Sequence, residues 1–313
     1  MVYDFSTTPM HEIIQILQQR SEEEIAFTVL NPDLGCGHYA GEMLEIEDNT
    51  YPHHSLKAWS SLAELLGYRM LLPQSATYPL VTIHFQKLQP ASSFHIDAVE
   101  DITEKYGSDS IFARLNKLEE PTFAWHYLAA LNAVKIRERD SILNLGINKG
   151  YEFLGIRDYI GENAFGRMQL TGIDHSHSAI SQARATLSYP NVTLHCHDIN
   201  ELHTLDIPRQ DLIISIGTLQ SPAINTKTLI MSLVQESLSP MGAIIFGFPN
   251  ARWIDGELIH GAKAPNYPYP EMSLLIKDIY WIKKYLQQHK FRVTITGKEY
   301  LFLTATKIVK KYV

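Results

Sequence analysis

The 313-residue chain is 45% hydrophobic and 19% charged, a composition that argues against a disordered, collagen-like or coiled-coil protein. At roughly 100–200 residues per domain, this length favours two domains. No apolar run approaches the ~20 residues of a membrane helix, so we expect no membrane association. The first residues show no signal-peptide pattern. Two widely separated cysteines predict no disulfide framework, and both features favour a cytoplasmic location.

The net charge of −7 is unevenly distributed along the chain. Residues 1–120 carry 18 acidic and 7 basic side chains, whereas residues 121–313 carry 16 acidic and 20 basic ones. An acidic front segment would repel a phosphate backbone. Nucleic acid is therefore a disfavoured partner, although the second part of the chain does not exclude it.

Residues 1–120 mix helix and strand patterns and contain no motif that points to a function. The pattern predicts a helix after Pro9, a strand at Glu24–Leu30, a helix at Ser55–Leu66 ended by Gly67, a strand at Leu80–Leu88, and helices around Asp97–Tyr106, Asp109–Leu118 and Thr122–Arg137. We interpret residues 1–120 as a smaller N-terminal α+β domain of unknown role.

From Ser141 onward, strand and helix patterns alternate, which is typical of a parallel sheet. The expected strands are Ser141–Gly146, Met168–Asp174, Val192–His197, Asp211–Gly217 and Ala243–Phe248, and the expected helices are Tyr151–Ile160, His177–Leu187, one near Thr226–Leu238, and Ser273–His289. At the end, Phe291–Thr296 and Glu299–Thr306 are joined by only two residues, which allows only an antiparallel hairpin. Residues 121–313 therefore read as a Rossmann-like α/β domain closed by a C-terminal hairpin.

A glycine-bearing turn follows the first of these strands, in the sequence Asn144-Leu-Gly-Ile-Asn-Lys-Gly150. It fits neither the dinucleotide fingerprint nor the P-loop. It resembles the first motif of the class I S-adenosylmethionine-dependent methyltransferases, an acidic residue followed by Gly-x-Gly-x-Gly. The resemblance assigns cofactor contacts to Asn144, Gly146, Asn148 and Gly150. Asn148 is a mild departure because Asn tolerates left-handed backbone. Asn144 replaces the carboxylate that helps hold the methionine ammonium.

Three later strand ends also resemble this family in the expected order. The resemblance implies that Asp174 accepts the ribose hydroxyls, that Asp198 binds the adenine amino group, and that the Ile199 backbone packs on the base. The strand at Asp211–Gly217, which contains Ser215, resembles the motif near the transferred methyl group. A purely structural reading stays open, because aspartates at strand ends are often helix caps.

Five histidines, His175, His177, His195, His197 and His203, cluster in this part of the sequence. Their spacing matches no known metal motif, so we expect no metal site. The long segment after the fifth strand is rich in rings and prolines, and it follows the edge where ligands bind in open α/β sheets. Its substrate-wall candidates are Arg252, Trp253, Lys263, Tyr267 and Tyr269, although a packing loop is an equally good reading.

The sequence thus predicts an S-adenosylmethionine-dependent methyltransferase acting on an unidentified substrate, with a small molecule favoured over protein or RNA. Catalysis by alignment and desolvation needs no dedicated base, so we name no catalytic residue. The alternative is a catalytically inactive binding or scaffold protein, which the departures at Asn144 and Asn148 support. A nicotinamide-dependent dehydrogenase is disfavoured because the dinucleotide fingerprint is missing. The sequence does not indicate an oligomeric state.

Overall fold

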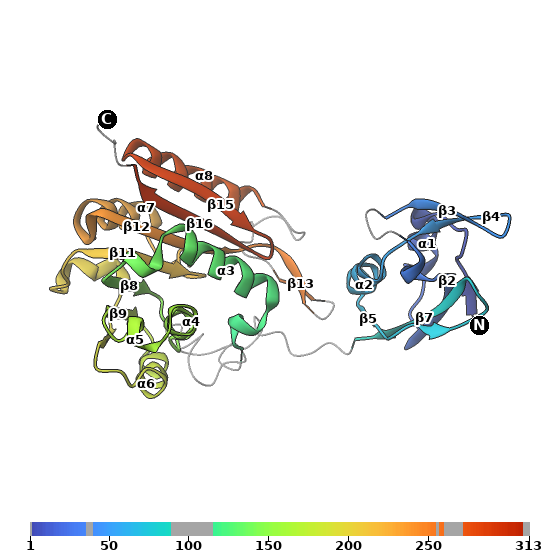
Figure 1. The fold of residues 1–313 in the computed structure, drawn as a ribbon, viewed down its shortest axis with the longest axis horizontal. Coiled ribbons are helices and arrows are strands. Elements are labelled where there is room, and N and C mark those ends of the chain that lie inside the picture. The colour runs from blue at the N-terminus through green and yellow to red at the C-terminus, as the bar shows by residue number, and fades with distance from the viewer. Residues whose placement is uncertain (1, 36–39, 89–114, 255–256, 260–271, 309–313) are drawn as a thin grey trace. The chain divides into compact units, whose positions relative to one another are not determined.

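The computed structural model describes residues 2–35, 40–88, 115–254, 257–259 and 272–308. The chain forms two compact units, one made of Met1–Ser93 with Arg252–Ile259 and the other of Phe94–Ala251 with His260–Val313. Figure 1 shows the elements of both units along the chain. The helix expected at Asp97–Tyr106, and most of the one at Asp109–Leu118, lie outside the described residues.

The first unit is built on a five-stranded mixed sheet in the order β1-β2-β7-β5, with β6 also paired to β7. Its elements are β1 (Val2–Asp4), α1 (Met10–Leu17), β2 (Glu24–Leu30), η1 (Pro32–Leu34), the hairpin β3 (Glu42–Ile46) and β4 (Asn49–His53), α2 (Leu56–Leu65), β5 (Tyr68–Met70), β6 (Gln74–Ser75), β7 (Leu80–Lys87), and the hairpin β13 (Arg252–Ile254) and β14 (Glu257–Ile259). The expected α+β architecture is confirmed.

An aromatic core holds this first unit together. Phe27 of β2 and Phe85 of β7 meet edge to face at 4.9 Å between ring centroids, a favoured geometry for aromatic pairs. Trp59 of α2 packs against Phe27 at 5.5 Å. The apolar faces of α1 and α2 are thus buried on the same sheet, as their helical periodicity requires.

The second unit contains a seven-stranded sheet in the order β10-β9-β8-β11-β12-β16-β15. The strands are β8 (Ser141–Leu145), β9 (Gln169–Asp174), β10 (Val192–Cys196), β11 (Gln210–Ile216), β12 (Leu238–Pro249), β15 (Phe291–Gly297) and β16 (Tyr300–Lys307). The pairs from β10 to β12 are parallel, whereas β16 is antiparallel to both β12 and β15. The parallel sheet closed by an antiparallel hairpin is therefore confirmed.

Helices cover both faces of this sheet, because alternate residues of each parallel strand face opposite sides. They are η4 (Lys117–Glu119), α3 (Pro121–Ala133), η5 (Ile136–Glu138), α4 (Tyr151–Ile160), α5 (Glu162–Phe165), α6 (His177–Thr186), η6 (Ile199–Thr204), α7 (Thr226–Ser232), η7 (Leu233–Ser237) and α8 (Ser273–Gln288). None of the helices in the described ranges is long and apolar enough to cross a membrane.

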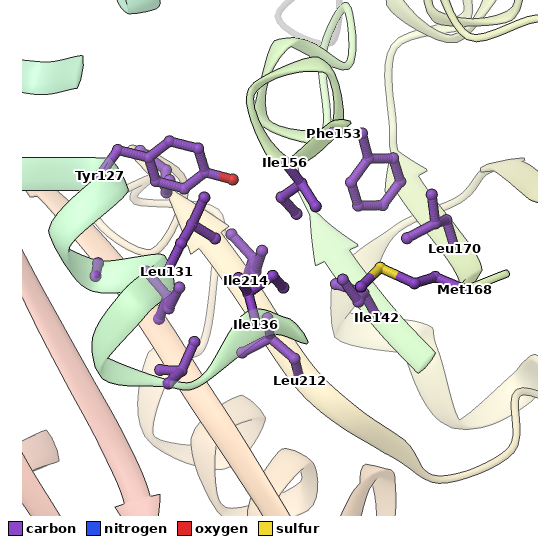
Figure 2. Packing of buried hydrophobic residues seen from close by; sticks show 14 of the residues in the cluster. Tyr127, Leu131, Ile136, Ile142, Phe153, Ile156, Met168, Leu170, Leu212 and Ile214 are labelled. Carbon is purple, nitrogen blue, oxygen red and sulfur yellow. The ribbon is translucent and has the colours of Figure 1, made fainter. Parts of the chain in front are cut away.

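Each face of this sheet packs into its own hydrophobic cluster. Figure 2 shows the first, in which Tyr127 of α3 and Ile156 of α4 pack over Ile142 of β8 and Ile214 of β11. The second lies on the opposite face and joins the strands to α7 and α8. Asn144 lies two residues after Ile142 in β8, so its side chain faces the side covered by α3 and α4.

Candidate ligand-binding site at the carboxyl edge of the sheet

The turn between β8 and α4 depends on three residues with positive φ. Gly146, Asn148 and Gly150 have φ values of +73°, +47° and +84°, a region that favours glycine and, among other residues, Asn. The turn is anchored to the next strand, because the N–H groups of Gly146 and Ile147 both donate to the Ile173 carbonyl, at 2.8 and 3.0 Å. Asn148 therefore occupies the position of the second glycine without breaking the turn.

Both glycines of the turn are also required by close packing. A Cβ on Gly146 would lie 2.0 Å from Oγ1 of Thr218, and a Cβ on Gly150 would lie 2.3 Å from Cδ1 of Leu187. Such distances do not occur between real atoms, so neighbouring groups would have to move. Thr218, at the end of β11, was not anticipated from the sequence and closes the turn from the adjacent strand.

Asp174, at the end of β9, is buried and fixed by two turns. Its Oδ2 accepts the N–H of Asn148 at 2.9 Å, and its Oδ1 accepts the N–H of Ser176 at 3.0 Å. The cap of α6 is Ser176, whose Oγ accepts the N–H of Ala179 at 3.0 Å. Each carboxylate oxygen can accept a second hydrogen bond, so Asp174 retains acceptor capacity for a ligand.

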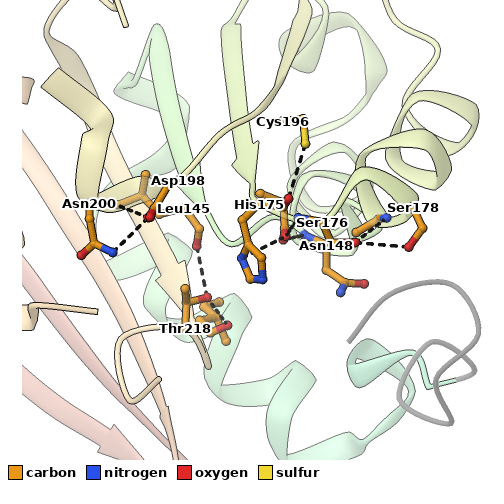
Figure 3. A network of polar contacts seen from close by, with 12 residues as sticks. Leu145, Asn148, His175, Ser176, Ser178, Cys196, Asp198, Asn200 and Thr218 are labelled. Carbon is orange, nitrogen blue, oxygen red and sulfur yellow. Dashed lines mark hydrogen bonds and ion pairs between the residues drawn. The ribbon is translucent and has the colours of Figure 1, made fainter. Parts of the chain in front are cut away.

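The remaining cofactor candidates lie in β11 and just after β10, and Figure 3 shows Asp198 beside Asn200. Asp198 follows β10, is exposed, and its Oδ1 accepts hydrogen bonds from the Asn200 backbone and side chain at 2.9 and 3.0 Å. Ile199 is buried beside it. Ser215 is fully buried in β11 and donates to the Leu145 carbonyl at 3.2 Å. The Ser215 hydroxyl thus links two strands, and the ligand contacts proposed for these residues stay predictions.

A buried polar pair lies beneath the turn. Asn144 is 1% exposed, and its Nδ2 has no hydrogen-bond partner of ordinary geometry among the described residues. Glu152, the second residue of α4, is 8% exposed. Burial raises the pKa of the Glu152 carboxyl, and Lys117 offsets this most, with smaller contributions from nearby groups that include Asn144. Sequence reasoning missed Glu152, although it lies four residues before the buried Ile156 and so on the inner face of its helix.

A hollow opens beside this pair within the second unit. Its lining includes Lys117, Phe123, Asn148, Tyr151 and Glu152. The Lys117 Nζ lies 5.5 Å from the centroid of the Tyr300 ring. It would also lie 3.4 Å from a Cβ on Gly217, the residue that follows β11. The hollow is also lined by Lys149, so it places one acidic residue, Glu152, and two lysines near the glycine turn.

The structure adds little support for a role of the histidines or of the substrate-wall candidates in this site. No three metal-binding side chains come together among the described residues, and burial together with His197 lowers the pKa of His195. Arg252 and Trp253 lie on β13, which belongs to the first unit, with only their backbone described. Lys263, Tyr267 and Tyr269 lie outside the described residues.

Comparisons with known proteins bear on the family. A family model described as a methyltransferase domain matches residues 136–292, which is half of the 313-residue chain. The search among curated proteins returned no match.

Several solved methyltransferases are similar in structure. Precorrin-6y C5,15-methyltransferase from Geobacter metallireducens GS-15 is 12% identical, with 58% of this chain and 87% of that chain covered and a TM-score of 0.41. N-methyltransferase NodS from Bradyrhizobium japonicum WM9, in complex with S-adenosyl-l-homocysteine, is 15% identical, with 61% of this chain and 91% of that chain covered and a TM-score of 0.41. Plantazolicin methyltransferase BpumL, in complex with a triazolic desmethylPZN analog and SAH, is 15% identical, with 66% of this chain and 95% of that chain covered and a TM-score of 0.46.

At these identities and TM-scores, none of the three structures bears on the substrate of this chain. The family match stands on its own, and it spans the strands, the glycine turn and Asp174 described above. The chain belongs to the methyltransferase domain family and is an S-adenosylmethionine-dependent methyltransferase with the class I fold.

Proposed function

We propose that this methyltransferase acts on a small molecule and binds S-adenosylmethionine along the carboxyl ends of β8, β9 and β10. The observation that carries the binding site is Asp174, a buried carboxylate held by N–H groups of two different turns. A ribose presents two neighbouring hydroxyl donors, and Asp174 offers two oxygens that each keep a free acceptor position. The side chain is already oriented, so binding would not have to order it.

The other residues fit the remaining parts of the cofactor. The two glycines of the Gly146–Gly150 turn give the backbone its positive φ values and leave room for Thr218 and Leu187, so the turn keeps the shape that the family uses to approach the cofactor. Asp198 is exposed at the next strand end, where it could accept from the adenine amino group. Glu152 lines the hollow beside the turn and supplies an acidic group there.

When bound, S-adenosylmethionine supplies an electrophilic methyl carbon next to a sulfonium centre. The work of this chain is then to hold both reactants in line and to exclude water, and such alignment supplies a large part of a barrier reduction. Gly217, which follows β11, ends the segment Asp211–Gly217 that resembles the family motif near the transferred methyl group. A proton acceptor is not required when the substrate nucleophile is neutral and its product loses a proton to water.

An inactive scaffold protein is the second candidate, because Asn144 and Asn148 depart from the family motif. Asn148 keeps the left-handed backbone and the N–H bond to Asp174, so this departure preserves the turn. The preference for an active enzyme rests on that preserved geometry.

The preference for a small-molecule substrate rests on charge. The acidic first 120 residues and the net charge of −7 disfavour a polyanionic substrate. A cell extract incubated with the enzyme and methyl-labelled S-adenosylmethionine, and then separated by molecular size, tests this preference. Label in the fraction below a few kilodaltons supports the proposal, and label confined to protein or RNA contradicts it.

Isothermal titration with S-adenosylhomocysteine tests the site itself. Asp174→Ala should weaken binding by at least ~1.5 kcal/mol, the scale of a lost charged hydrogen bond. Asp206→Ala is the matched control, since Asp206 is exposed on the loop before β11. Equal affinity of the wild type and Asp174→Ala would remove Asp174 from the site. Absence of binding by the wild type would favour the scaffold protein.

A further inference from the structure

The cofactor of this family ends in a zwitterionic α-amino acid, and its ammonium group needs an anionic partner. Asn144 is a weaker partner for that group, because an amide oxygen is a neutral acceptor and hydrogen bonds to a charged acceptor are roughly twice as strong. The Asn144 amide is buried, and it acts on the Glu152 carboxyl, whose pKa it lowers through a side-chain hydrogen bond that is not of ordinary geometry. The strand end therefore lacks the expected charge, and another group must supply it if binding is to be tight.

Glu152, on the first turn of α4, is a buried carboxylate that follows the glycine turn directly. It is 8% exposed and lines the hollow that begins at the glycine turn. The backbone carbonyl of Glu152 accepts the hydroxyl of the buried Tyr127 at 2.9 Å, which fixes the first turn of α4. Asn144 is close enough to contribute to the electrostatics of the Glu152 carboxyl. The first turn of α4 thus supplies a carboxylate, Glu152, near the end of β8, where Asn144 is neutral.

A buried carboxylate is costly without a counter-charge. Burial raises the pKa of Glu152, and Asp174 adds to this effect, whereas Lys117 from η4 acts in the opposite direction. The hollow is lined by Glu152 together with two lysines, Lys117 and Lys149. These opposite charges complement the ammonium and carboxylate of an α-amino acid.

We propose that Glu152, rather than residue 144, receives the methionine ammonium group of the cofactor in this chain. The anchor has moved from the end of β8 to the start of α4, and Asn144 lies beside it as a neutral neighbour. This inference rests on the proposed cofactor site, because it assumes that the amino-acid end of the ligand enters the hollow at the turn.

Two ligands separate this contact from the rest of the site. S-adenosylhomocysteine carries the amino-acid end, and 5′-methylthioadenosine lacks it. In isothermal titration, Glu152→Gln should weaken S-adenosylhomocysteine by about 10- to 100-fold, the range of a charge-assisted bond. Its affinity for 5′-methylthioadenosine should stay within about threefold of wild type, because the adenosine contacts are intact.

A double variant tests whether the position of the charge is what matters. Asn144→Asp combined with Glu152→Gln returns the carboxylate to the strand, and it should regain most of the lost affinity for S-adenosylhomocysteine. Asn144→Asp alone should not tighten binding, since two adjacent buried carboxylates disfavour each other's ionised form. Melting curves of all three variants accompany the titrations.

The outcomes are distinguishable. Equal affinity of wild type and Glu152→Gln for S-adenosylhomocysteine, or an equal loss for both ligands, overturns the role of Glu152 while leaving the cofactor site in place. Tighter binding by Asn144→Asp alone also overturns it, because the vacancy would then lie at residue 144. If the wild type binds neither ligand, the proposed function itself fails.

Discussion

Asp174 shows how one residue serves both the fold and the ligand. Its two oxygens hold the N–H groups of Asn148 and Ser176, so it joins the turn after β8 to the turn after β9. A ligand that uses the remaining acceptor positions would bind to a group that the fold has already oriented. A loss of binding on mutation must therefore be separated from a loss of structure.

Unfolding in urea makes that separation. Asp174→Ala should lower the free energy of unfolding by about 2–3 kcal/mol, because two buried N–H groups lose a charged acceptor. Asp174→Asn should cost less, since its amide oxygen still accepts one of them. Asp206→Ala, on an exposed site, should stay within about 0.5 kcal/mol of wild type. Equal stability of all four proteins would show that Asp174 has no role in the two turns.

Glu152 gives a pH dependence whose sign follows from its burial. Burial raises its pKa above the unfolded value of about 4.5. The other titratable groups that affect this carboxyl or are affected by it are Lys117, Asp174 and Tyr127. A carboxyl with a raised folded pKa contributes stability that is fully present below the unfolded pKa and is lost as the pH rises through the folded pKa.

Replacing the Glu152 carboxyl with an amide removes the loss of stability that accompanies its ionisation at higher pH. The melting temperature of Glu152→Gln, relative to wild type, should therefore be higher at about pH 8 than at about pH 4. Thermal unfolding of the unliganded proteins across that range measures the difference. A constant difference between the two proteins at every pH would mean that the Glu152 pKa is the same in the folded and unfolded chains.

At the scale of elements, Gly150 in the β8–α4 turn can be compared with Gly67, which follows α2. Gly150 has φ +84° and a Cβ there would lie 2.3 Å from Leu187, whereas Gly67 has φ +77° and open space around it. Gly67→Ala should cost about 1–2 kcal/mol for the left-handed backbone alone. Gly150→Ala should cost about 1–3 kcal/mol more, because it also overpacks. Equal values in urea unfolding would contradict the packing role of Gly150.

The elements that the sequence predicts best are those with strong hydrophobic patterns. The strands β11 and β12 contain nearly continuous apolar runs. Strand and helix patterns alternate between β8 and β12, and the two-residue join at Gly297-Lys298 permits only a hairpin, so the strand directions in the second sheet are predictable. The short strands β1 and β6, and the hairpin β3–β4, have no such pattern, because their residues are mostly exposed or half-buried. The positions of β1 and β6 depend on pairing with β2 and β7, which a local pattern does not reveal.

The site is predictable where a motif marks it and hidden where packing decides. Gly146, Gly150 and Asp174 follow from the order of strands and turns. Glu152 does not, because a charged residue in the first turn of a helix ordinarily faces water and favours the helix dipole. The i, i+4 relation to Ile156 was the available signal, but only the three-dimensional structure shows what lies opposite.

At the scale of the whole molecule, the two units have separate hydrophobic cores. Phe27, Trp59 and Phe85 belong to one core, whereas the residues that contact the sheet of the second unit form the other two clusters. Every proposed cofactor residue lies in the second unit. Ligand binding should therefore stabilise the two units unequally.

Calorimetry tests this expectation. We expect two unfolding transitions, and S-adenosylhomocysteine at 100 times its dissociation constant should stabilise only one of them, by about 2.7 kcal/mol. The variant Glu152→Gln assigns that transition to the second unit. It should reduce the ligand-induced stabilisation of that transition and leave the other transition unchanged. A single transition, or an equal shift of both, would show that the units unfold cooperatively.

The hairpin β13–β14 makes the first unit discontinuous, since residues 252–259 join residues 1–93. During synthesis, domains generally fold from the N-terminus as they leave the ribosome. The sheet of β1, β2, β5, β6 and β7 can form early, but the hairpin is not available until the five strands from β8 to β12 have been made. The unit that begins the chain is therefore completed only after five of the seven strands of the methyltransferase sheet have been translated, and the nascent protein carries an unfinished first unit during that time.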